Sequence, residues 1–240
     1  MNVPKFISYI NNTWIDLENA ILNKNAASMV KNLTRLDLTT KKMATTHIGL
    51  LISMAVSCLD DDECYVNVGT WNGYSFFAGF FLNPNKECIG NDNFSLFTKE
   101  YSVNATEKDK AHRNFGDIKE QFYLEFNRIK TPNAIFKEGD WRDFLSNFRT
   151  TTDKKIGFYF YDGGHDFDSQ YDALKIVQPY LSQEYLILVD DVNLIDVEKA
   201  NEKFISENPE FSKIVDIKTP CNRYPTWWNG IQLFTRGQHG

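Results

Sequence analysis

Residues 65–75 read Tyr65-Val66-Asn67-Val68-Gly69-Thr70-Trp71-Asn72-Gly73-Tyr74-Ser75. A four-residue run that suits a buried strand stops at Gly69, and an apolar segment that suits a helix begins after Gly73. Because glycine carries no side chain, the backbone at these two positions can turn sharply and come close to a ligand. A tight connection without a ligand would show the same G-x-x-x-G spacing. The segment predicts a strand, a glycine turn and a helix whose free N-terminal N–H groups would meet a bound ligand.

Length and charge limit the classes of protein to consider. The 240 residues, 42% of them hydrophobic, fit one α/β domain, placed at residues 61–240, after a helical appendage at residues 1–60. The net charge of -6 and the absence of a dense Lys/Arg run argue against a nucleic-acid partner. The sequence contains no run of about 18 apolar residues and no signal-peptide pattern. We therefore expect a cytoplasmic protein that does not associate with membranes.

The first 60 residues contain helical patterns, among them Trp14 to Leu22 and Ile48 to Cys58. A polar linker, Leu36 to Lys42, is expected to be exposed between them. Such an appendage could cover a substrate cleft, or its helices could form the contact of a homo-oligomer. The sequence leaves both open.

After the opening segment, apolar runs alternate with helical patterns. Further strands are predicted at Glu87–Gly90, Ala134–Lys137, Ile156–Tyr161, Tyr185–Val189, Lys213–Ile217 and Ile231–Thr235. Helices are predicted at Asp117–Ile129, Asp143–Phe148 and Val197–Glu207, and from a capping box at Ser169 and Asp172 to about Leu181. Residues 94–115 are polar and irregular and predict an insertion that is either mobile or covers the substrate. Five strand–helix alternations and a final strand pair predict a doubly wound, mostly parallel sheet of seven strands with one antiparallel strand.

In such sheets the ligand lies beyond the carboxyl ends of the strands. Each of the first five predicted strands ends in a glycine or an acidic residue: Gly69, Asp92, Glu138 with Asp140, Asp162 with His165, and Asp190 with Asp191. Asp92 follows Gly69 by roughly the 20 residues that are typical of a nucleotide-ribose ligand. A solvated loop aspartate is the alternative for that residue taken alone.

Three carboxylates at neighbouring strand ends, Asp162, Asp190 and Asp191, would form an all-oxygen site suited to magnesium. His165 follows Asp162 across two glycines, and an imidazole with a pKa near 6.5 can accept a proton at neutral pH. The carboxylates would raise that pKa in the absence of a metal, and a bound dication would offset them. The alternative is an exposed histidine at a helix entry.

This pattern resembles the class I S-adenosylmethionine-dependent methyltransferases over roughly residues 60–236. It is most similar to the metal-dependent O-methyltransferases of the catechol and macrolide-sugar types. Val68 to Ser75 is similar to their first motif, which wraps the methionine part of the cofactor, and Asp92 matches their ribose-binding acid. Asp162-Gly163-Gly164-His165 resembles the Asp-x-x-His of the sugar enzymes, in which the Asp binds magnesium and the His is the general base. Asp190-Asp191 falls on their second acidic pair.

The resemblance implies a cofactor site whose residues are Asn67, Gly69, Thr70, Gly73, Asp92, Asp140 and Asp162. Asp140 falls where such enzymes contact the adenine. Two positions depart from the pattern. Asn67 replaces an acid, so its amide can accept a hydrogen bond from the cofactor's ammonium group but supplies no charge. Gly164 stands where relatives often have Asp, which adds backbone freedom beside His165.

The function expected is an S-adenosylmethionine-dependent O-methyltransferase, assisted by magnesium, that acts on a small hydroxylated metabolite or glycoside. The loop Pro220–Asn229 contains Trp227 and Trp228, whose flat faces suit sugars or aryl rings, unless they only pack the final strand pair. A cofactor-binding module without activity is one alternative, because Asn67 and Gly164 could mark a decayed site. An NAD-dependent oxidoreductase is another, although its G-x-G-x-x-G fingerprint is missing.

Overall fold

The computed structural model describes residues 1–11, 13–95 and 117–237. Its strands are β1 (Ile15–Asp16), β2 (Ile21–Leu22), β3 (Glu63–Val68), β4 (Glu87–Asp92), β5 (Ala134–Glu138), β6 (Lys155–Tyr161), β7 (Leu181–Val189), β8 (Phe211–Ile217) and β9 (Ile231–Arg236). Its α-helices are α1 (Val3–Ile10), α2 (Ala27–Thr39), α3 (Thr46–Ser57), α4 (Tyr74–Phe81), α7 (Ile118–Ile129), α8 (Trp141–Ser146), α9 (Phe167–Val177) and α10 (Ile195–Glu207). Short 3₁₀ turns lie at Lys24–Ala26, Phe148–Thr150 and Gln178–Tyr180.

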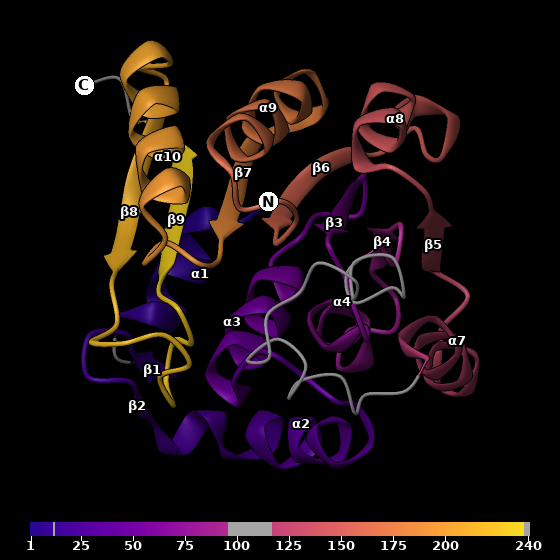
Figure 1. Cartoon of the computed structure of the whole chain (residues 1–240). Coiled ribbons are helices and arrows are strands. Elements are labelled where there is room, and N and C mark those ends of the chain that lie inside the picture. The colour runs from indigo at the N-terminus through magenta and orange to yellow at the C-terminus, as the bar shows by residue number, and fades with distance from the viewer. Residues whose placement is uncertain (12, 96–116, 238–240) are drawn as a thin grey trace, which may run out of the picture.

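The large sheet has seven strands in the order β5-β4-β3-β6-β7-β9-β8 (Figure 1). The pairs from β5 to β7 are parallel, and β9 runs antiparallel to both of its neighbours. The predicted fold class is confirmed: a doubly wound, mostly parallel sheet with one antiparallel strand. The chain builds outward from β3 to β5 and then crosses back to β6, so the order reverses beside β3. Ligands of open α/β sheets bind at such a reversal.

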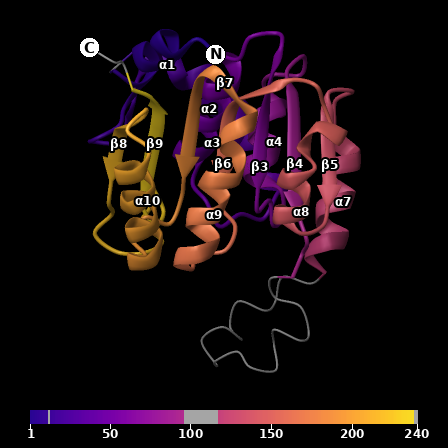
Figure 2. The same ribbon diagram turned by 90° about the horizontal axis from the view of Figure 1, so that it is seen from above.

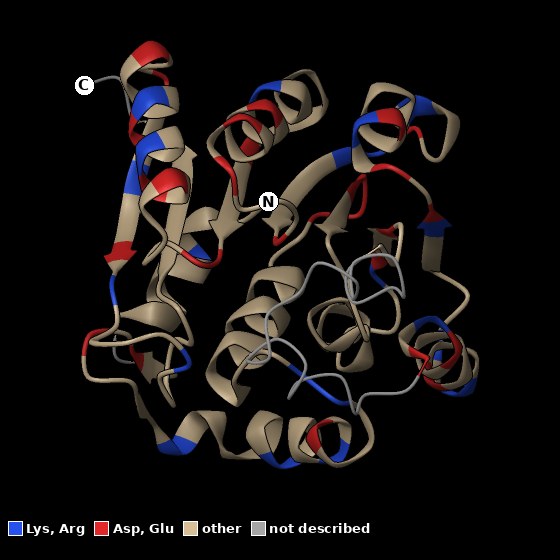
Figure 3. Cartoon of the chain, in the orientation of Figure 1, with Lys and Arg blue, Asp and Glu red and all other residues tan. Residues whose placement is uncertain are grey.

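Helices cover both faces of this sheet. Helices α8, α9 and α10 lie on one face, and α3, α4 and α7 lie on the other (Figures 1 and 2). Helix α2 packs outside α3 and α4 as a further layer. Figure 3 shows that α3 and α4 carry no charged residues, whereas the helices at the surface do. A helix enclosed between a sheet and another helix has no solvated face, so an apolar sequence is required on all sides.

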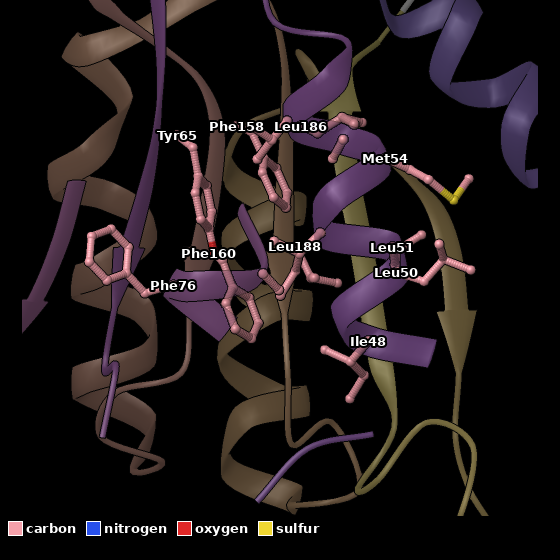
Figure 4. Packing of buried hydrophobic residues seen from close by; sticks show 14 of the residues in the cluster. Ile48, Leu50, Leu51, Met54, Tyr65, Phe76, Phe158, Phe160, Leu186 and Leu188 are labelled. Atoms are coloured by element: carbon pink, nitrogen blue, oxygen red, sulfur yellow. The ribbon is translucent and has the colours of Figure 1, made fainter. Parts of the chain in front are cut away.

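The core beneath β3 is built from aromatic and aliphatic side chains. Tyr65 on β3 stacks on Phe158 of β6 with ring centroids 4.9 Å apart. Side chains of α3, such as Ile48 and Leu51, pack with Leu188 of β7 in the same buried cluster (Figure 4). The cluster therefore joins elements from both sides of residue 60. The division into an appendage and a domain at that residue, and a contact between copies through the N-terminal helices, stay predictions.

Two predictions for the first 60 residues are wrong. Residues 14–22 do not form a helix, because they contain the antiparallel pair β1 and β2. Asp16 starts the turn between them, since its carboxylate accepts hydrogen bonds from the backbone and side-chain nitrogens of Asn19. The predicted linker from Leu36 is helical as far as Thr39, the last residue of α2. The predicted helix from Ile48 is confirmed as α3.

The start of α9 also differs from the prediction. Asp166 caps this helix by accepting the N–H of Ser169 at 2.9 Å, so the helix begins before the predicted capping box. At its far end a 3₁₀ turn containing Pro179 stops the helix, and Leu181 begins β7. Most of the predicted insertion, residues 96–115, lies outside the described residues. Within the described part of the chain, no helix is long and apolar enough to cross a membrane.

The turn after β3 should tolerate no side chain at Gly69. A Cβ atom there would lie 1.9 Å from the carbonyl oxygen of Asp162, and the φ of Gly69 is +82°. We expect Gly69→Ala to lower the free energy of unfolding by on the order of 3 kcal/mol or more, measured by urea denaturation. Gly139→Ala is the matched control, because Gly139 has φ +146° but nothing within 4 Å of an added Cβ. It should cost only about 1–2 kcal/mol of backbone strain. Equal losses in the two variants would contradict the collision.

Candidate functional site

A cavity of about 840 Å³ lies at the carboxyl edge of the parallel strands. The segments that follow β3, β4, β5, β6 and β7 all contribute to its wall, and the loop between β8 and β9 closes one side. Its lining includes most of the residues singled out in the sequence: Gly69, Asp92, Asp140, Asp162, His165, Asp190, Asp191 and Trp228. The expected convergence of strand ends on one site is therefore present.

Asp92 lies at the end of β4 and joins two loops of the cavity. Its carboxylate accepts the backbone N–H groups of Trp71 and Phe94, each at 2.6 Å. Burial raises the pKa of Asp92, and these backbone hydrogen bonds oppose the rise. The carboxylate is thus fixed beside the glycine turn, where it can accept hydrogen bonds from ligand hydroxyls.

Asn91, the residue before Asp92, was missed by the sequence analysis. Its side chain is buried against the cavity, and its amide nitrogen donates to the carbonyl oxygens of Lys137 at 2.8 Å and Gly139 at 3.1 Å. Among the residues that the structure describes, nothing donates to its Oδ1 atom. An unsatisfied buried amide oxygen beside a cavity is suited to accept a hydrogen bond from a ligand. An asparagine within a strand gave no signal of this in the sequence.

Three of the residues implied for the cofactor, Asn67, Thr70 and Gly73, do not line the cavity. Asn67 is fully buried, and its Oδ1 atom accepts the hydroxyl of Ser75 at 2.8 Å. The amide oxygen expected to meet an ammonium group therefore already has a donor. Thr70 is buried in the turn, and Gly73 begins α4 with φ +96°. These three residues determine the shape of the turn but do not form the surface of the cavity.

The wall after β5 is aromatic and charged. Asp140 caps α8 by accepting the N–H of Arg142 at 2.8 Å, and it lines the cavity. Trp141 meets Tyr161 edge to face at 5.6 Å, and the guanidinium of Arg142 lies 4.3 Å from the centre of the indole. Glu138 instead binds Lys119 and the hydroxyl of Tyr123 outside the cavity. The indole of Trp141 is a flat surface against which a planar ring can pack.

In the same cavity, His165 lies between two carboxylates. Its Nε2 atom is 2.8 Å from Oδ2 of Asp191 and 3.5 Å from Oδ1 of Asp162. Each of the three residues offers one ligand atom, and these atoms lie within 4.8 Å of one another. Burial lowers the pKa of His165, but hydrogen bonds and charge from the two carboxylates outweigh it and raise the pKa to about 10. Burial, with the charge of Asp191, raises the pKa of Asp162, against the opposing bond to His165.

Asp190 was predicted as a third metal ligand, and this role stays a prediction. Its side chain is buried, and one oxygen accepts the N–H of Asp191 at 2.9 Å. Burial, with the neighbouring charge of Asp191, raises its pKa. Asp190 lines the same cavity, whereas the group of possible ligand atoms within 4.8 Å of one another consists of Asp162, His165 and Asp191.

Backbone strain is concentrated around this cavity. Four residues that line it have left-handed φ angles although none of them is glycine: Trp71 (46°), Asp191 (61°), Arg223 (63°) and Trp228 (53°). Each such residue costs roughly 1–3 kcal/mol unless its surroundings hold it in place. Strain of this kind typically clusters at ligand and active sites.

The two adjacent tryptophans of the last loop have different roles. Trp227 is buried, donates its indole N–H to the carbonyl of Leu17 at 3.0 Å and packs edge to face on His47 at 5.6 Å. Trp228 lines the cavity beside Arg223. Trp227 therefore packs the loop against the N-terminal segment, whereas Trp228 lies where a ligand in the cavity can contact it.

Comparison with known proteins identifies the family. A family model described as a methyltransferase domain matches residues 66–192, more than half of the chain. No curated protein matches the sequence.

Solved structures show a related fold at low sequence identity. An O-methyltransferase from Bacillus cereus, in complex with S-adenosylhomocysteine (SAH), aligns with a TM-score of 0.54, 13% identity and coverage of 94% of this chain and 99% of that one. TomG from Streptomyces achromogenes is an O-methyltransferase of tomaymycin synthesis, solved in complex with S-adenosylmethionine (SAM). It aligns with a TM-score of 0.55, 13% identity and coverage of 93% of this chain and 96% of that one. CalS11, a TDP-rhamnose 3'-O-methyltransferase of calicheamicin biosynthesis, aligns with a TM-score of 0.50, 13% identity and coverage of 99% of this chain and 93% of that one. The shared fold, the convergence of strand ends on one cavity and the matched domain together show that the chain belongs to the class I S-adenosylmethionine-dependent methyltransferases.

Proposed function

We propose that this protein transfers the methyl group of S-adenosylmethionine to a hydroxyl of a small, ring-bearing metabolite, with a divalent metal, magnesium by preference, bound beside His165. One observation supports the proposal most directly. Asp162, His165 and Asp191 meet in the same cavity that the glycine turn and Asp92 also line. A methyltransferase for hydroxyl groups needs such a pairing of a cofactor site with a group that removes a proton.

Different residues of the cavity would bind the ribose and the adenine of the cofactor. Asp92 would accept hydrogen bonds from the ribose hydroxyls, since its carboxylate is held in place by two backbone N–H groups. Asp140 and Trp141 would bind the adenine end. When bound, S-adenosylmethionine supplies an electrophilic methyl group on a sulfonium centre. The Oδ1 atom of Asn91 offers a further acceptor in the cavity wall.

For the metal, the donor set fits a hard divalent cation. Asp162 and Asp191 contribute carboxylate oxygens, the ligands that magnesium prefers, and His165 lies between them. When bound, the metal would stabilise the developing negative charge on the acceptor oxygen. The neighbouring carboxylates raise the pKa of His165 despite its burial, and burial together with the charge of Asp191 raises the pKa of Asp162, because negative charge is concentrated in this part of the cavity. A bound cation would balance this negative charge.

His165 is assigned as the general base. A hydroxyl has a high pKa, so transfer to its oxygen requires a group that takes the proton as the bond to carbon forms. Among the residues that the structure describes, His165 is the only histidine that lines the cavity. With a pKa near 10 it would hold a proton at neutral pH, and a neighbouring dication would lower that pKa toward the range in which the ring can accept one.

The acceptor would bind between the catalytic group and the last loop. Trp228 offers a flat aromatic face, which suits the apolar face of a sugar or an aryl ring. Both a glycoside and an aryl alcohol meet this requirement. The aromatic wall and the paired carboxylates with His165 also favour catalysis over a module that only binds the cofactor.

The assignment of Asp92 is tested by cofactor binding. Asp92→Ala should weaken binding of SAH by roughly 1.5–3 kcal/mol, the scale of hydrogen bonds to a charged group, measured by titration calorimetry. Asp92→Asn keeps one oxygen as an acceptor and should lose less. A folded Asp92→Ala variant with wild-type affinity would remove Asp92 from the cofactor site.

The metal is tested by chelation. EDTA should abolish methyl transfer to an accepted substrate while SAH still binds, because the proposed metal ligands, Asp162 and Asp191, are not the residues assigned to the ribose and the adenine. Magnesium should restore the rate. Asp191→Asn, which keeps the shape of the side chain but removes its charge, should need more magnesium for half-maximal activity. Full activity in chelator would show that the acidic group has another role.

The base is tested by two substitutions at His165. His165→Ala should lower kcat by on the order of 10² to 10⁴, the usual range for loss of a general base, with little change in SAH affinity. His165→Gln keeps a hydrogen-bond donor but cannot take the proton, so it should be about as slow. If His165→Gln retains near-normal kcat with saturating magnesium, His165 serves by hydrogen bonding alone.

A further inference from the structure

We propose that Asn229 is a positioning residue that links the acceptor-side loop, residues 222–229, to the carboxylate of Asp191, so that binding of the acceptor and binding of the metal reinforce each other. In the sequence, Asn229 stands out only as the last residue of that loop. The inference rests on the proposed function, because Asp191 is a metal ligand only under that proposal. The contacts themselves do not depend on a metal.

Asn229 uses both ends of its side-chain amide. Its nitrogen donates a hydrogen bond to Oδ1 of Asp191, and its oxygen accepts the backbone N–H of Arg223 at 2.7 Å. Its own carbonyl accepts the N–H of Asn193 at 2.8 Å, which ties it to the segment after β7. One side chain therefore connects the start of the loop with the acidic end of the cavity.

The contact with Asp191 determines where the second carboxylate oxygen points. Oδ1 of Asp191 accepts from Asn229, and Oδ2 lies 2.8 Å from Nε2 of His165. A carboxylate held at one oxygen cannot rotate without breaking that bond, so the other oxygen stays directed at His165. Partners of this kind, which orient a metal ligand without touching the metal, typically change metal affinity by 10- to 100-fold when removed.

The loop end of the link carries strained backbone. Arg223 and Trp228 both have left-handed φ angles, and Tyr224 and Trp228 exchange backbone hydrogen bonds of 2.8 and 3.1 Å. The bond from Arg223 N–H to Asn229 helps to hold this conformation. An acceptor that rests on Trp228 would stabilise the same loop conformation that keeps the amide of Asn229 on Asp191. By thermodynamic reciprocity, a metal on Asp191 would then favour the loop conformation that binds the acceptor.

The metal side of the link is tested with Mn²⁺ as the probe, bound to the cofactor-free protein and measured by electron paramagnetic resonance. Asn229→Ala should raise the Kd for Mn²⁺ by about 10- to 100-fold. It should change the Kd for SAH by less than about twofold, because the side chain of Asn229 bonds to Asp191 and Arg223 and not to the residues assigned to the cofactor. Asn222→Ala is the matched control, because Asn222 lines the same cavity but its side chain contacts Asn193 rather than Asp191. It should leave the Mn²⁺ affinity unchanged. Equal Mn²⁺ affinity in wild type and Asn229→Ala would overturn the link while leaving the proposed function intact.

The loop side is tested without metal, by hydrogen exchange at the amide of Arg223. Asp191→Gly removes the acceptor for Asn229 and tolerates the left-handed backbone at this position. It should speed exchange at Arg223 by roughly five- to tenfold, the effect of losing one hydrogen bond. Asp191→Asn keeps an oxygen for Asn229 and should preserve protection. Unchanged exchange in Asp191→Gly would refute the link. A wild type that binds no Mn²⁺ would refute the metal in the proposed function, and the exchange result would still decide whether Asn229 couples the two segments.

Discussion

The site depends on how closely the turn after β3 approaches the end of β6. The N–H of Asp162 donates to the carbonyl of Val68 at 2.9 Å, and the carbonyl of Asp162 lies where a side chain of Gly69 would begin. This approach brings the glycine turn and the first carboxylate of the proposed metal group to the same edge of the sheet. It also fixes the direction in which Asp162 enters the cavity. A turn displaced outward by one side chain would move the proposed cofactor-binding turn away from the proposed metal group.

Electrostatics set a second constraint on the site. Three carboxylates and one imidazole share a small volume, and burial makes each negative charge there costly. The protein alone reduces that cost by holding a proton on His165 and by raising the pKa values of Asp162 and Asp190. Protons and a dication at the proposed metal site would therefore compete for the same negative charge, and the protonation of His165 would then depend on whether the dication is bound.

Much of this could be predicted from the sequence, because the strands of a parallel sheet are continuous apolar runs and their ends carry the polar residues. The end of β3 at Gly69 and the pairing of Asp162 with His165 followed from that pattern. Residues 15–22 were misjudged because two-residue strands are too short to show a period, and the Asx turn at Asp16 overrode a weak helical pattern. The roles of Asn91 and Asn229 could not be predicted. Their partners lie more than 35 residues away, at Lys137, Gly139 and Asp191, and only the folded chain brings them together.

The anchoring of the last loop has a consequence for how the site forms during synthesis. Trp227 binds the carbonyl of Leu17, 210 residues earlier, and the carbonyl of Thr226 accepts the hydroxyl of Thr45, 181 residues earlier. Contacts between such distant residues form late, because most of the chain must leave the ribosome before the two partners can meet. The glycine turn and Asp92 lie in the first half of the chain and can be in place well before that. A nascent chain would therefore assemble the wall assigned to the cofactor before the wall assigned to the acceptor.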